Sequence, residues 1–576
     1  MKKRITLIAV LLSFLIITDL RGQIRQARQD MLLFNYSHAI TLLEKNFRKS
    51  DKETRLEMAR LLAECYRKQN NMEKARDWYE EAIEMGSKDP LNWYYLACCR
   101  RSCGAYIPAK IAFLKYDSLA PSDNKGKINA AFCDSALAWL KKKPVFEAWN
   151  AKELNSPQSD FAAVAAGSKL FFTSDRFGGK TDPVYGWTGN SYLRIYTAGI
   201  IRADSSTISF GQPEEGPGEF NQSFHDGPLC FSNDMNEVFI NRTIEVTDKA
   251  RHDSGSIQTH LLKIYHAVKK NGKWSKPEPF FLNSRKYSVG HPALSPDGNT
   301  LYFVSDSEGG YGGTDIWSCT RSDGRWSEPV NMGKGINTPG NEMFPFLDEK
   351  GNLYFASDGY PGFGGLDIYI AKRSGSGWEP PVNPGPPFNS SRDDFALVAW
   401  PGGISGTFSS NRPGGLGNDD IYCFRALPPA KEVVGLPPAV AENKPKEIPP
   451  RLAVGKTYRI ENIYYDFDKW NIRKDAEHSL DSLISILKEY PVNVEIGSHT
   501  DCRGSAGYNE TLSQKRAESV VSYLIKQGID PSRLTARGYG KSQLINRCNC
   551  EANVACTEAE HQANRRTEFR ITGIIN

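Results

Sequence analysis

Few of the motifs that mark enzymes, membrane-spanning proteins or nucleic-acid-binding proteins occur in this sequence. It has no G-x-S-x-G nucleophile turn, no H-E-x-x-H motif and no C-x-x-C pair at the spacing of zinc ligands. No stretch after residue 17 approaches the 18 apolar residues of a membrane span. The formal net charge is +5, and the first 22 residues carry +3 of it, so the rest of the chain is too close to neutral to indicate nucleic-acid binding. We therefore expect a soluble protein with no enzymatic activity, no cofactor and no metal.

The N-terminus has the pattern of a secretory signal peptide. Basic residues at positions 2–4 precede an apolar run, Ile5–Ile17, which is short for a membrane span and typical of a signal peptide. Cleavage after Gly22 suits the small-residue rule only loosely, and an uncleaved anchor is the alternative. No cysteine precedes Cys65, so no lipoprotein acylation site accompanies the signal. We expect residues 1–22 to be removed on export.

Residues 24–143 carry a helical pattern that repeats every 34 residues. The matched positions are Ala63 with Ala97, Ala75 with Ala109, and Tyr79 with Phe113. A weaker copy lies around Tyr36 and Ala39. Small residues with an aromatic residue one turn later resemble tetratricopeptide (TPR) repeats, which implies an all-α solenoid that docks a peptide or a partner protein. The alternative is a plain helical bundle with coincidental spacing.

Residues 145–426 repeat with a period of 52 residues and read as short alternating strands separated by Gly, Asp and Asn turns. The matched positions include Tyr302 with Tyr354, Asp306 with Asp358, Asp315 with Asp367, and Trp326 with Trp378. We count five units, and the segment KPVFEAWN before the first one could complete the last. These units resemble PD40 (WD40-like) repeats of the TolB type, which implies an all-β propeller of five or six blades.

Aspartates recur at one place in these units, in GGTDIW, GGLDIY and NDDIY. A calcium or catalytic function would require a cluster in one unit rather than one aspartate in each. We therefore expect Asp315, Asp367 and Asp420 to accept hydrogen bonds from turn amides.

A proline-rich segment follows at residues 427–451 and predicts an extended tether. Seven of its 25 residues are proline, with Lys and Glu between them, so it cannot form a packed core. At about 3.1 Å per residue it would reach roughly 75 Å. Beyond it, residues 452–576 alternate strand and helix patterns, which predicts a separate α+β domain.

One arginine in this last domain lies where an apolar residue is expected. Arg516 stands four residues after Leu512 and four before Val520, on the inward stripe of a predicted helix. An unpaired buried guanidinium costs several kcal/mol, so Arg516 requires an anion. One interpretation is an internal ion pair with Asp501; the other is that the two residues flank a groove and hold the two ends of a zwitterion.

Four segments of this domain, YYDFDKWNI, HTDCRGSAGYNETLSQKRAESVVSYL, ARGYG and NRRTEF, resemble in order the OmpA-like peptidoglycan-binding domain shared with Pal. The resemblance covers about 115 residues, Tyr458–Gly573, and includes N-x-x-L-S-x-x-R-A from Asn509 to Ala517. It implies that Asp501 and Arg516 hold the amine and the carboxylate of meso-diaminopimelate in the peptidoglycan stem peptide. Carried over by position, the further lining residues are Thr500, Asn509, Leu512, Asp466 and Arg565.

Four cysteines depart from or extend that pattern. Cys502 follows the key aspartate, and the insert RCNCEANVACTE adds Cys548, Cys550 and Cys556. The resemblance implies a disulfide in this loop, which we assign as Cys550–Cys556, with Cys502–Cys548 as a second bridge in an oxidising compartment. Unpaired surface cysteines are the alternative.

The whole arrangement resembles outer-membrane-associated proteins of bacteria with type IX secretion. It implies a periplasmic scaffold that grips peptidoglycan and engages outer-membrane or secretion proteins through its repeats. A general envelope-integrity protein and, less favoured, a propeller hydrolase are the alternatives.

Overall fold

The computed structural model divides the chain into two compact units, Met1–Ala430 and Lys431–Asn576. It describes residues 22–176, 183–203, 208–222, 224–248, 257–375, 377–427, 454–455, 457–460, 480–550 and 556–574. The expected signal peptide and nearly all of the expected proline-rich tether lie outside these residues. In the described part of the chain, we find no helix that combines the length and the apolar character needed to cross a membrane.

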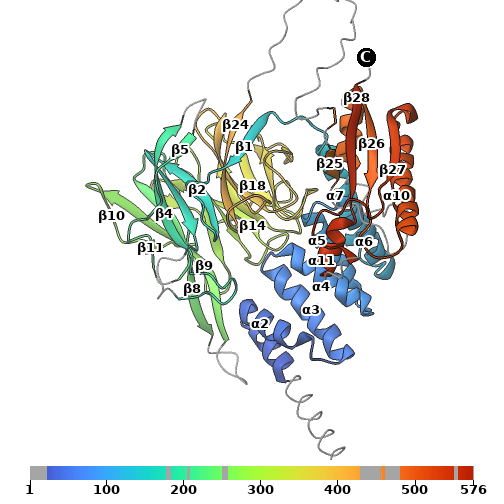
Figure 1. Cartoon of the computed structure of the whole chain (residues 1–576). Coiled ribbons are helices and arrows are strands. Elements are labelled where there is room, and N and C mark those ends of the chain that lie inside the picture. The colour runs from blue at the N-terminus through green and yellow to red at the C-terminus, as the bar shows by residue number, and fades with distance from the viewer. Residues whose placement is uncertain are drawn as a thin grey trace, which may run out of the picture. The chain divides into compact units, whose positions relative to one another are not determined.

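The first unit begins with a helical region, in which each helix packs against the next (Figure 1). After helical residues 22–32 come α2 (Tyr36–Phe47), α3 (Lys52–Lys68), α4 (Met72–Glu84), α5 (Pro90–Ser102), α6 (Tyr106–Leu119) and α7 (Lys125–Trp139). Side chains of Asp51, Asn71 and Asp89 accept backbone hydrogen bonds at the starts of α3, α4 and α5, which fixes where these helices begin. All six residues of the 34-residue pattern are at most 3% exposed, so the repeated positions form the contacts between the helices.

The rest of this unit consists of antiparallel sheets. The first contains β2 (Asp160–Ala166), β3 (Lys169–Ser174), β4 (Arg194–Ala203), β5 (Ile208–Phe210) and β6 (Glu214–Glu215). The second contains β7 (Asp226–Phe231), β8 (Glu237–Asp248), β9 (Ile257–Lys270), β10 (Lys273–Trp274) and β11 (Glu278–Pro279). The third contains β12 (Val289–Leu294), β13 (Thr300–Ser305), β14 (Asp315–Ser322), β15 (Arg325–Trp326) and β16 (Val330–Asn331). The fourth contains β17 (Glu342–Leu347), β18 (Leu353–Ser357) and β19 (Asp367–Ala371). The next two strands in sequence, β20 (Arg373–Ser374) and β21 (Gly377–Trp378), pair with each other.

The last sheet of the first unit is completed by a strand from far earlier in the sequence. β1 (Phe146–Asn150) pairs with β24 (Asp420–Ala426), beside β23 (Ser405–Ser410) and β22 (Asp394–Ala399). This is the pairing expected from KPVFEAWN. The aromatic ring of Phe146 lies 5.0 Å from that of Phe388 and 5.8 Å from that of Phe424, so apolar packing joins the two ends of the repeat region.

Each of these five sheets has a β-bulge at the same place, where its first repeat strand (β2, β7, β12, β17 or β22) pairs with the next strand. One residue inside each bulge has a positive φ: Ala162, Gly227, His291, Phe344 and Ala396. Such a backbone is unfavourable for non-glycine residues, and its recurrence shows that each unit repeats a local backbone geometry as well as a sequence pattern. A cavity of about 710 Å³ is lined by residues of all five first strands.

The repeated aspartates bond to turn amides as expected. Asp315 Oδ2 accepts the Tyr311 amide at 2.5 Å, and Asp367 Oδ2 accepts the Phe363 amide at 2.7 Å. Asp420 Oδ2 accepts the Leu416 amide at 2.6 Å. The structural interpretation of these aspartates is therefore confirmed.

Direct contacts join the helical region to the sheets within the first unit. The Trp187 indole N–H donates to the Lys68 carbonyl at 2.9 Å, and Gln69 Nε2 donates to the Trp187 carbonyl at 2.7 Å. Phe363 is fully buried in the apolar cluster of α6 and α7. The boundary that we placed between residues 143 and 145 thus separates two kinds of secondary structure inside one compact unit.

The second unit is a four-stranded sheet with helices packed on it. Its elements are β25 (Thr457–Ile460), α9 (Asp481–Glu489), β26 (Val492–Ser498), α10 (Ala506–Lys526), η3 (Pro531–Arg533), β27 (Leu534–Gly538), α11 (Glu558–Asn564) and β28 (Thr567–Ile574). The strand order is β25-β28-β26-β27, and only the pair β26–β27 is parallel among the described strands of this sheet. Leu483 and Leu487 of α9 and Val520 and Leu524 of α10 pack with the sheet in one apolar core.

We expect Phe146→Ala to loosen the last sheet of the first unit. The loss of a half-buried phenyl group should cost about 2 kcal/mol, roughly half the value at a fully buried site. Amide hydrogen exchange in β24 should then be about 30-fold faster. Val145→Ala, which removes methyl groups from a side chain that is 69% exposed, is the matched control and should leave exchange unchanged. If the amide exchange rates in β24 are the same in Phe146→Ala and Val145→Ala, the Phe146 side chain of β1 does not stabilise this sheet.

Candidate functional site

The predicted site lies at one edge of the second unit's sheet, where the parallel strands β26 and β27 both end. Because parallel strands end on the same edge, the residues after each strand become neighbours. The Thr500 amide donates to the Gly540 carbonyl at 2.9 Å, and the Tyr539 amide donates to the Ser498 carbonyl at 2.9 Å. The turn that carries Thr500 and Asp501 is therefore fixed on both sides before α10 begins.

Two glycines let α10 lie close to this edge. A Cβ atom on Gly538 would lie 2.3 Å from the Gln514 amide nitrogen, so only glycine allows this approach. Gly540 has a φ of +53°, and its amide donates to Ser513 Oγ at 2.9 Å. The segment ARGYG thus holds the first half of α10 against the turn that carries Asp501.

Asp501 is 6% exposed and is surrounded by cationic groups. Its Oδ2 accepts hydrogen bonds from Arg565 Nη1 at 2.5 Å and from Arg503 Nη2 at 2.7 Å, and its Oδ1 accepts the Arg503 amide at 3.0 Å. Burial acts to raise the pKa of Asp501, but the hydrogen bonds from Arg503 and Arg565 outweigh it and hold this pKa below the ordinary value. The carboxylate is therefore ionised at neutral pH although it is almost excluded from water.

Two of the three residues that we singled out on α10 are polar and buried. Arg516 is 4% exposed and Asn509 is 3% exposed, whereas Leu512 is half-buried. Asn509 Nδ2 donates to the Arg503 carbonyl at 2.7 Å, which ties the first turns of α10 to the Asp501 turn. The burial predicted for Arg516 is confirmed. Arg503 and Arg565 both form ion pairs with Asp501.

The other predicted residues divide into three cases. Arg565 is in direct contact with Asp501, as described above. Thr500 is 3% exposed, and its hydroxyl has no hydrogen-bond partner among the residues that the structure describes. Asp466 lies outside the described residues. A buried hydroxyl without a partner costs free energy, so the Thr500 hydroxyl is available for a ligand group.

A cavity of about 850 Å³ opens beside this turn. Cys502 lies in its wall, together with the basic residues Arg537, Lys541 and Arg547 and the acidic residue Glu510. Asp501 and Arg516 are not among its lining residues. The cavity is therefore a neighbouring space of mainly positive charge rather than the predicted site itself.

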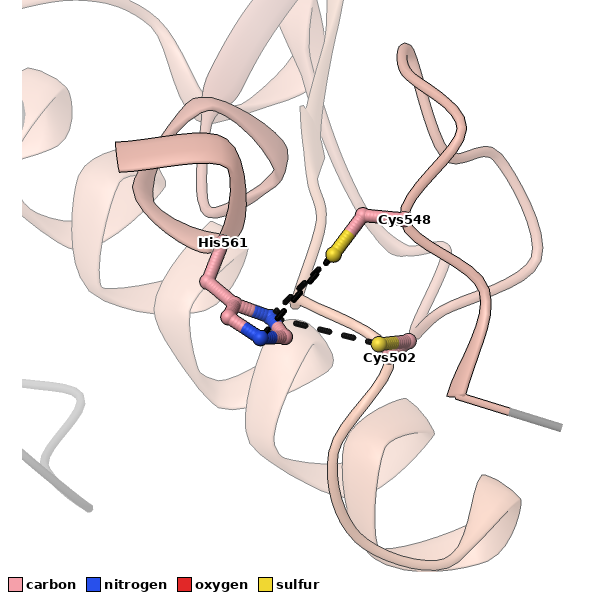
Figure 2. Close-up of side chains that lie close together, drawn as sticks. All are labelled: Cys502, Cys548 and His561. Carbon is pink, nitrogen blue, oxygen red and sulfur yellow. Dashed lines mark hydrogen bonds between the residues drawn. The ribbon is translucent and has the colours of Figure 1, made fainter. Parts of the chain in front are cut away.

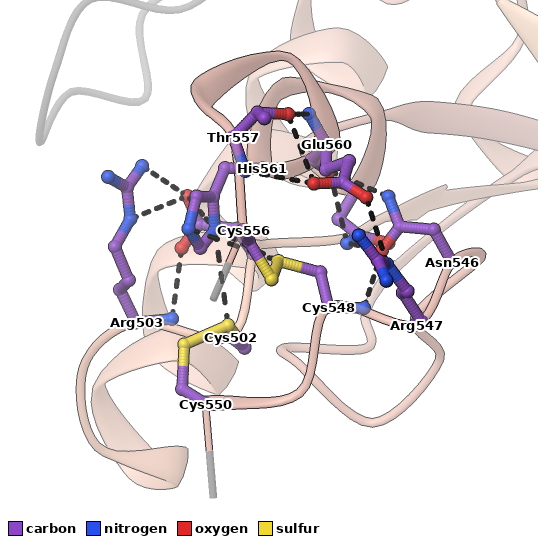
Figure 3. The surroundings of a disulfide bond; sticks show 12 residues. Cys502, Arg503, Asn546, Arg547, Cys548, Cys550, Cys556, Thr557, Glu560 and His561 are labelled. Carbon is purple, nitrogen blue, oxygen red and sulfur yellow. Dashed lines mark hydrogen bonds and ion pairs between the residues drawn. A yellow bond between two sulfur atoms is a disulfide. The ribbon is translucent and has the colours of Figure 1, made fainter. Parts of the chain in front are cut away.

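The disulfide pairing that we assigned from the resemblance is wrong. The structure joins Cys502 to Cys550 and Cys548 to Cys556, with Cα–Cα distances of 5.4 and 5.7 Å (Figure 3). The loop after β27 folds back against α11, where Asn546 Nδ2 donates to the Glu560 carbonyl at 2.8 Å. That path brings Cys550 to the Asp501 turn and leaves Cys548 beside Cys556.

Two further residues of the site were missed from the sequence. Arg503 follows the aspartate by two positions, so its proximity was visible, but its side chain could equally have pointed to solvent. His561 of α11 is 9% exposed, and its Nδ1 lies 3.9 Å from Asp501 Oδ2 and 3.6 Å from Cys548 Sγ. The one feature of the sequence that could have indicated a role for His561 was its position five residues after Cys556.

Comparisons with known proteins include a family model that falls within the second unit. A family model described as the OmpA family matches residues 464–556. Outer membrane protein A of Bordetella avium is 31% identical over 147 residues, which are 25% of this chain and 71% of that protein. Outer membrane porin F of Pseudomonas fluorescens is 38% identical over 120 residues, which are 20% of this chain and 35% of that protein. The chain thus spans about a third of the length of porin F.

Among solved structures, the peptidoglycan-associated lipoprotein from Burkholderia pseudomallei is 29% identical, with a TM-score of 0.17; the match covers 19% of this chain and 87% of that one. The sequence comparisons bear out the resemblance that we based on the four C-terminal segments.

We expect Arg565→Ala to raise the pKa of Asp501, because it removes one of the hydrogen bonds that stabilise the carboxylate. In the unaltered protein the pKa is lowered from 3.8, so the contribution of Asp501 to stability is present above pH 3.8 and is lost as the pH falls through the folded-state pKa. A carbon-detected NMR titration of the Asp501 carboxylate measures the change. Arg547→Ala, at a guanidinium that is 76% exposed and pairs with Glu560, is the control. An unchanged pKa in Arg565→Ala would show that the ion pair does not form in solution.

Proposed function

Through its C-terminal unit the chain belongs to the OmpA family, and on this premise we propose that the unit binds peptidoglycan without covalent chemistry. The ligand is meso-diaminopimelate of the stem peptide, which carries an ammonium group and a carboxylate on the same carbon. The observation that carries this proposal is the buried, ionised Asp501 in the turn before α10, together with Arg516, which is buried on the inner face of that helix. A buried anion and a buried cation on consecutive elements suit the two ends of a zwitterion.

The neighbouring groups support the same ligand. The Thr500 hydroxyl, which has no partner among the described residues, can donate to the ligand carboxylate or accept from its ammonium group. The cationic cavity that contains Arg537, Lys541 and Arg547 offers space and positive charge for the other carboxylates of the stem peptide.

The arginines on Asp501 set a condition for binding. The ligand ammonium must share the carboxylate with Arg503 and Arg565 or displace one of them. The Arg503 side chain is 46% exposed and the Arg565 side chain 23% exposed, so Arg503 is the easier one to release to water. Arg503 thus keeps Asp501 ionised in the absence of the wall and leaves when the ligand arrives.

The binding test uses cosedimentation of the full chain with purified sacculi that contain diaminopimelate. Asp501→Asn and Arg516→Lys should each weaken binding by about 30-fold or more, because each removes one partner of a desolvated charge contact. Lys488→Gln, at an exposed lysine in the last turn of α9, is the control and should pellet with the wall as the unaltered chain does. Circular dichroism and thermal melting establish that each variant is folded.

The opposite result is equally clear. If folded Asp501→Asn and Arg516→Lys pellet with the wall as the unaltered chain does, the zwitterion contact is wrong. Arg503→Gln separates the displacement step from the contact itself: we expect it to bind at least as tightly as the unaltered chain, and a 30-fold loss would mean that Arg503 contacts the ligand directly.

We further propose that the first unit is a binding scaffold rather than an enzyme. The buried positions of the 34-residue pattern support TPR-type helix pairs. The five bulged sheets around one cavity, with β1 completing the last of them, support a propeller of five blades. The chain would then be a periplasmic protein at the outer membrane that links wall peptidoglycan to an outer-membrane or type IX secretion complex. This assignment of partners comes from the resemblance of the whole arrangement.

Affinity capture with the tagged full chain separates this role from general envelope integrity. Recovery of secretion components in stoichiometric amounts, by wild type and by Arg516→Lys alike, is the expected result. Recovery of abundant porins alone would favour an envelope-integrity role. A hydrolase would instead release soluble fragments from purified sacculi, and we expect none.

A further inference from the structure

The two disulfides of the second unit meet at a buried histidine. Cys502 is 2% exposed, Cys548 is fully buried and His561 is 9% exposed. Figure 2 shows both sulfur atoms directed toward the imidazole ring. The ligand atoms of these three residues all lie within 4.8 Å of one another, and Cys550 and Cys556 are bonded to two of them.

The imidazole has only weak contacts in the disulfide form. The distances from His561 Nδ1 are 3.6 Å to Cys548 Sγ, 3.9 Å to Cys502 Sγ and 3.9 Å to Asp501 Oδ2. Nitrogen–oxygen hydrogen bonds in proteins are about 2.7–3.2 Å long, so the carboxylate contact is not one. The structure thus describes no strong hydrogen bond for a ring that is almost excluded from water, which is a costly arrangement.

The same distances fit a tetrahedral metal site. With zinc–sulfur bonds of about 2.3 Å and zinc–nitrogen bonds of about 2.0–2.1 Å, neighbouring sulfur and nitrogen ligands lie about 3.6 Å apart. The Nδ1–Sγ distances of 3.6 and 3.9 Å are close to that value. Cys548 Sγ also lies 3.9 Å from Nε2, so the imidazole has to rotate about its side-chain bonds to direct a nitrogen lone pair at the metal. Neutral imidazole and thiolate are also the ligands that select zinc.

We propose that the reduced form of this cluster binds one Zn²⁺, with Cys502, Cys548 and His561 as three ligands and Cys550 or Cys556 as the fourth. Each disulfide takes two electrons and two protons from a dithiol, which is itself oxidised to a disulfide. Binding then releases the protons of the three ligating thiols, and His561 binds through a neutral nitrogen. Four protein ligands leave no open position, so the zinc is structural rather than catalytic.

The location gives the site a consequence for the neighbouring aspartate. Cys502 follows Asp501 directly, and His561 lies four residues before Arg565, which contacts Asp501. Either the disulfides or the zinc ion would fasten the loop after β27 and the helix α11 to the Asp501 turn. The metal site does not depend on wall binding, and wall binding does not depend on the metal.

Cobalt titration of the reduced full chain tests the proposal. The chain is reduced with a dithiol, desalted without oxygen and titrated with Co²⁺, whose thiolate charge-transfer and d–d bands report a tetrahedral site. We expect one equivalent of cobalt that zinc displaces. His561→Ala and Cys502→Ser should each weaken cobalt binding by 100-fold or more, whereas Cys103→Ser, at a free cysteine of the first unit, should not change it.

A second measurement covers variants that fail to fold. In the unaltered reduced chain, Zn²⁺ should protect the ligating thiols among Cys502, Cys548, Cys550 and Cys556 from alkylation, as read by peptide mass mapping. The proposal is overturned if these thiols react equally with and without zinc, if cobalt uptake is the same in His561→Ala and the unaltered chain, or if the dithiol leaves both disulfides intact in the folded protein.

Discussion

A carboxylate that is almost excluded from water has to be surrounded by donors, and at Asp501 this requirement organises the functional end of the second unit. The side chains of Arg503 and Arg565 reach it from the turn itself and from the end of α11, and the Arg503 carbonyl in turn accepts from Asn509 of α10. The Asp501 turn, the end of α11 and, through the Arg503 carbonyl, the first turns of α10 are thus linked around one charge. If Asp501 were neutral, the guanidinium groups of Arg503 and Arg565 would both lose this charged acceptor.

A second carboxylate stabilises the backbone behind this turn. His499 Nε2 lies 3.5 Å from Glu568 Oε2, and Arg566 Nε donates to Glu568 Oε1 at 2.6 Å. These contacts lower the pKa of Glu568 to about 2. His499 directly precedes Thr500 and Asp501, and its amide donates to the Arg566 carbonyl at 2.9 Å. The turn is therefore anchored to the start of β28, which limits the conformational freedom of the backbone around Thr500 and Asp501.

The features that could be predicted from the sequence are those encoded by periodicity. The position of Arg516 on a helical stripe predicted its burial, and the recurrence of Asp315, Asp367 and Asp420 predicted their hydrogen bonds to turn amides. Periodicity also predicted that the segment of β1 completes the last sheet, because that segment resembles a strand of the repeat.

Contacts between segments that have no shared period were not predictable in the same way. Four cysteines allow three pairings, and the assigned one was wrong because only the folded path of the loop after β27 decides which sulfurs meet. His561 joined the site for the same reason, since α11 is placed by the sheet rather than by local sequence. Likewise, the contact of Trp187 with α3 joins two regions that we had assigned to separate domains.

The central claim is that Asp501 and Arg516 hold the two ends of one zwitterionic carbon, and a matched pair of soluble stem peptides tests it most directly. Isothermal titration of the full chain would compare a tripeptide whose third residue is meso-diaminopimelate with one whose third residue is lysine. In both peptides the C-terminal α-carboxyl is amidated, so they differ only in the carboxylate that makes the amine-bearing carbon zwitterionic. The account predicts binding of the first and at least about 30-fold weaker binding of the second, because a desolvated Arg516 would lose its carboxylate partner. Equal affinity for the two peptides would contradict it.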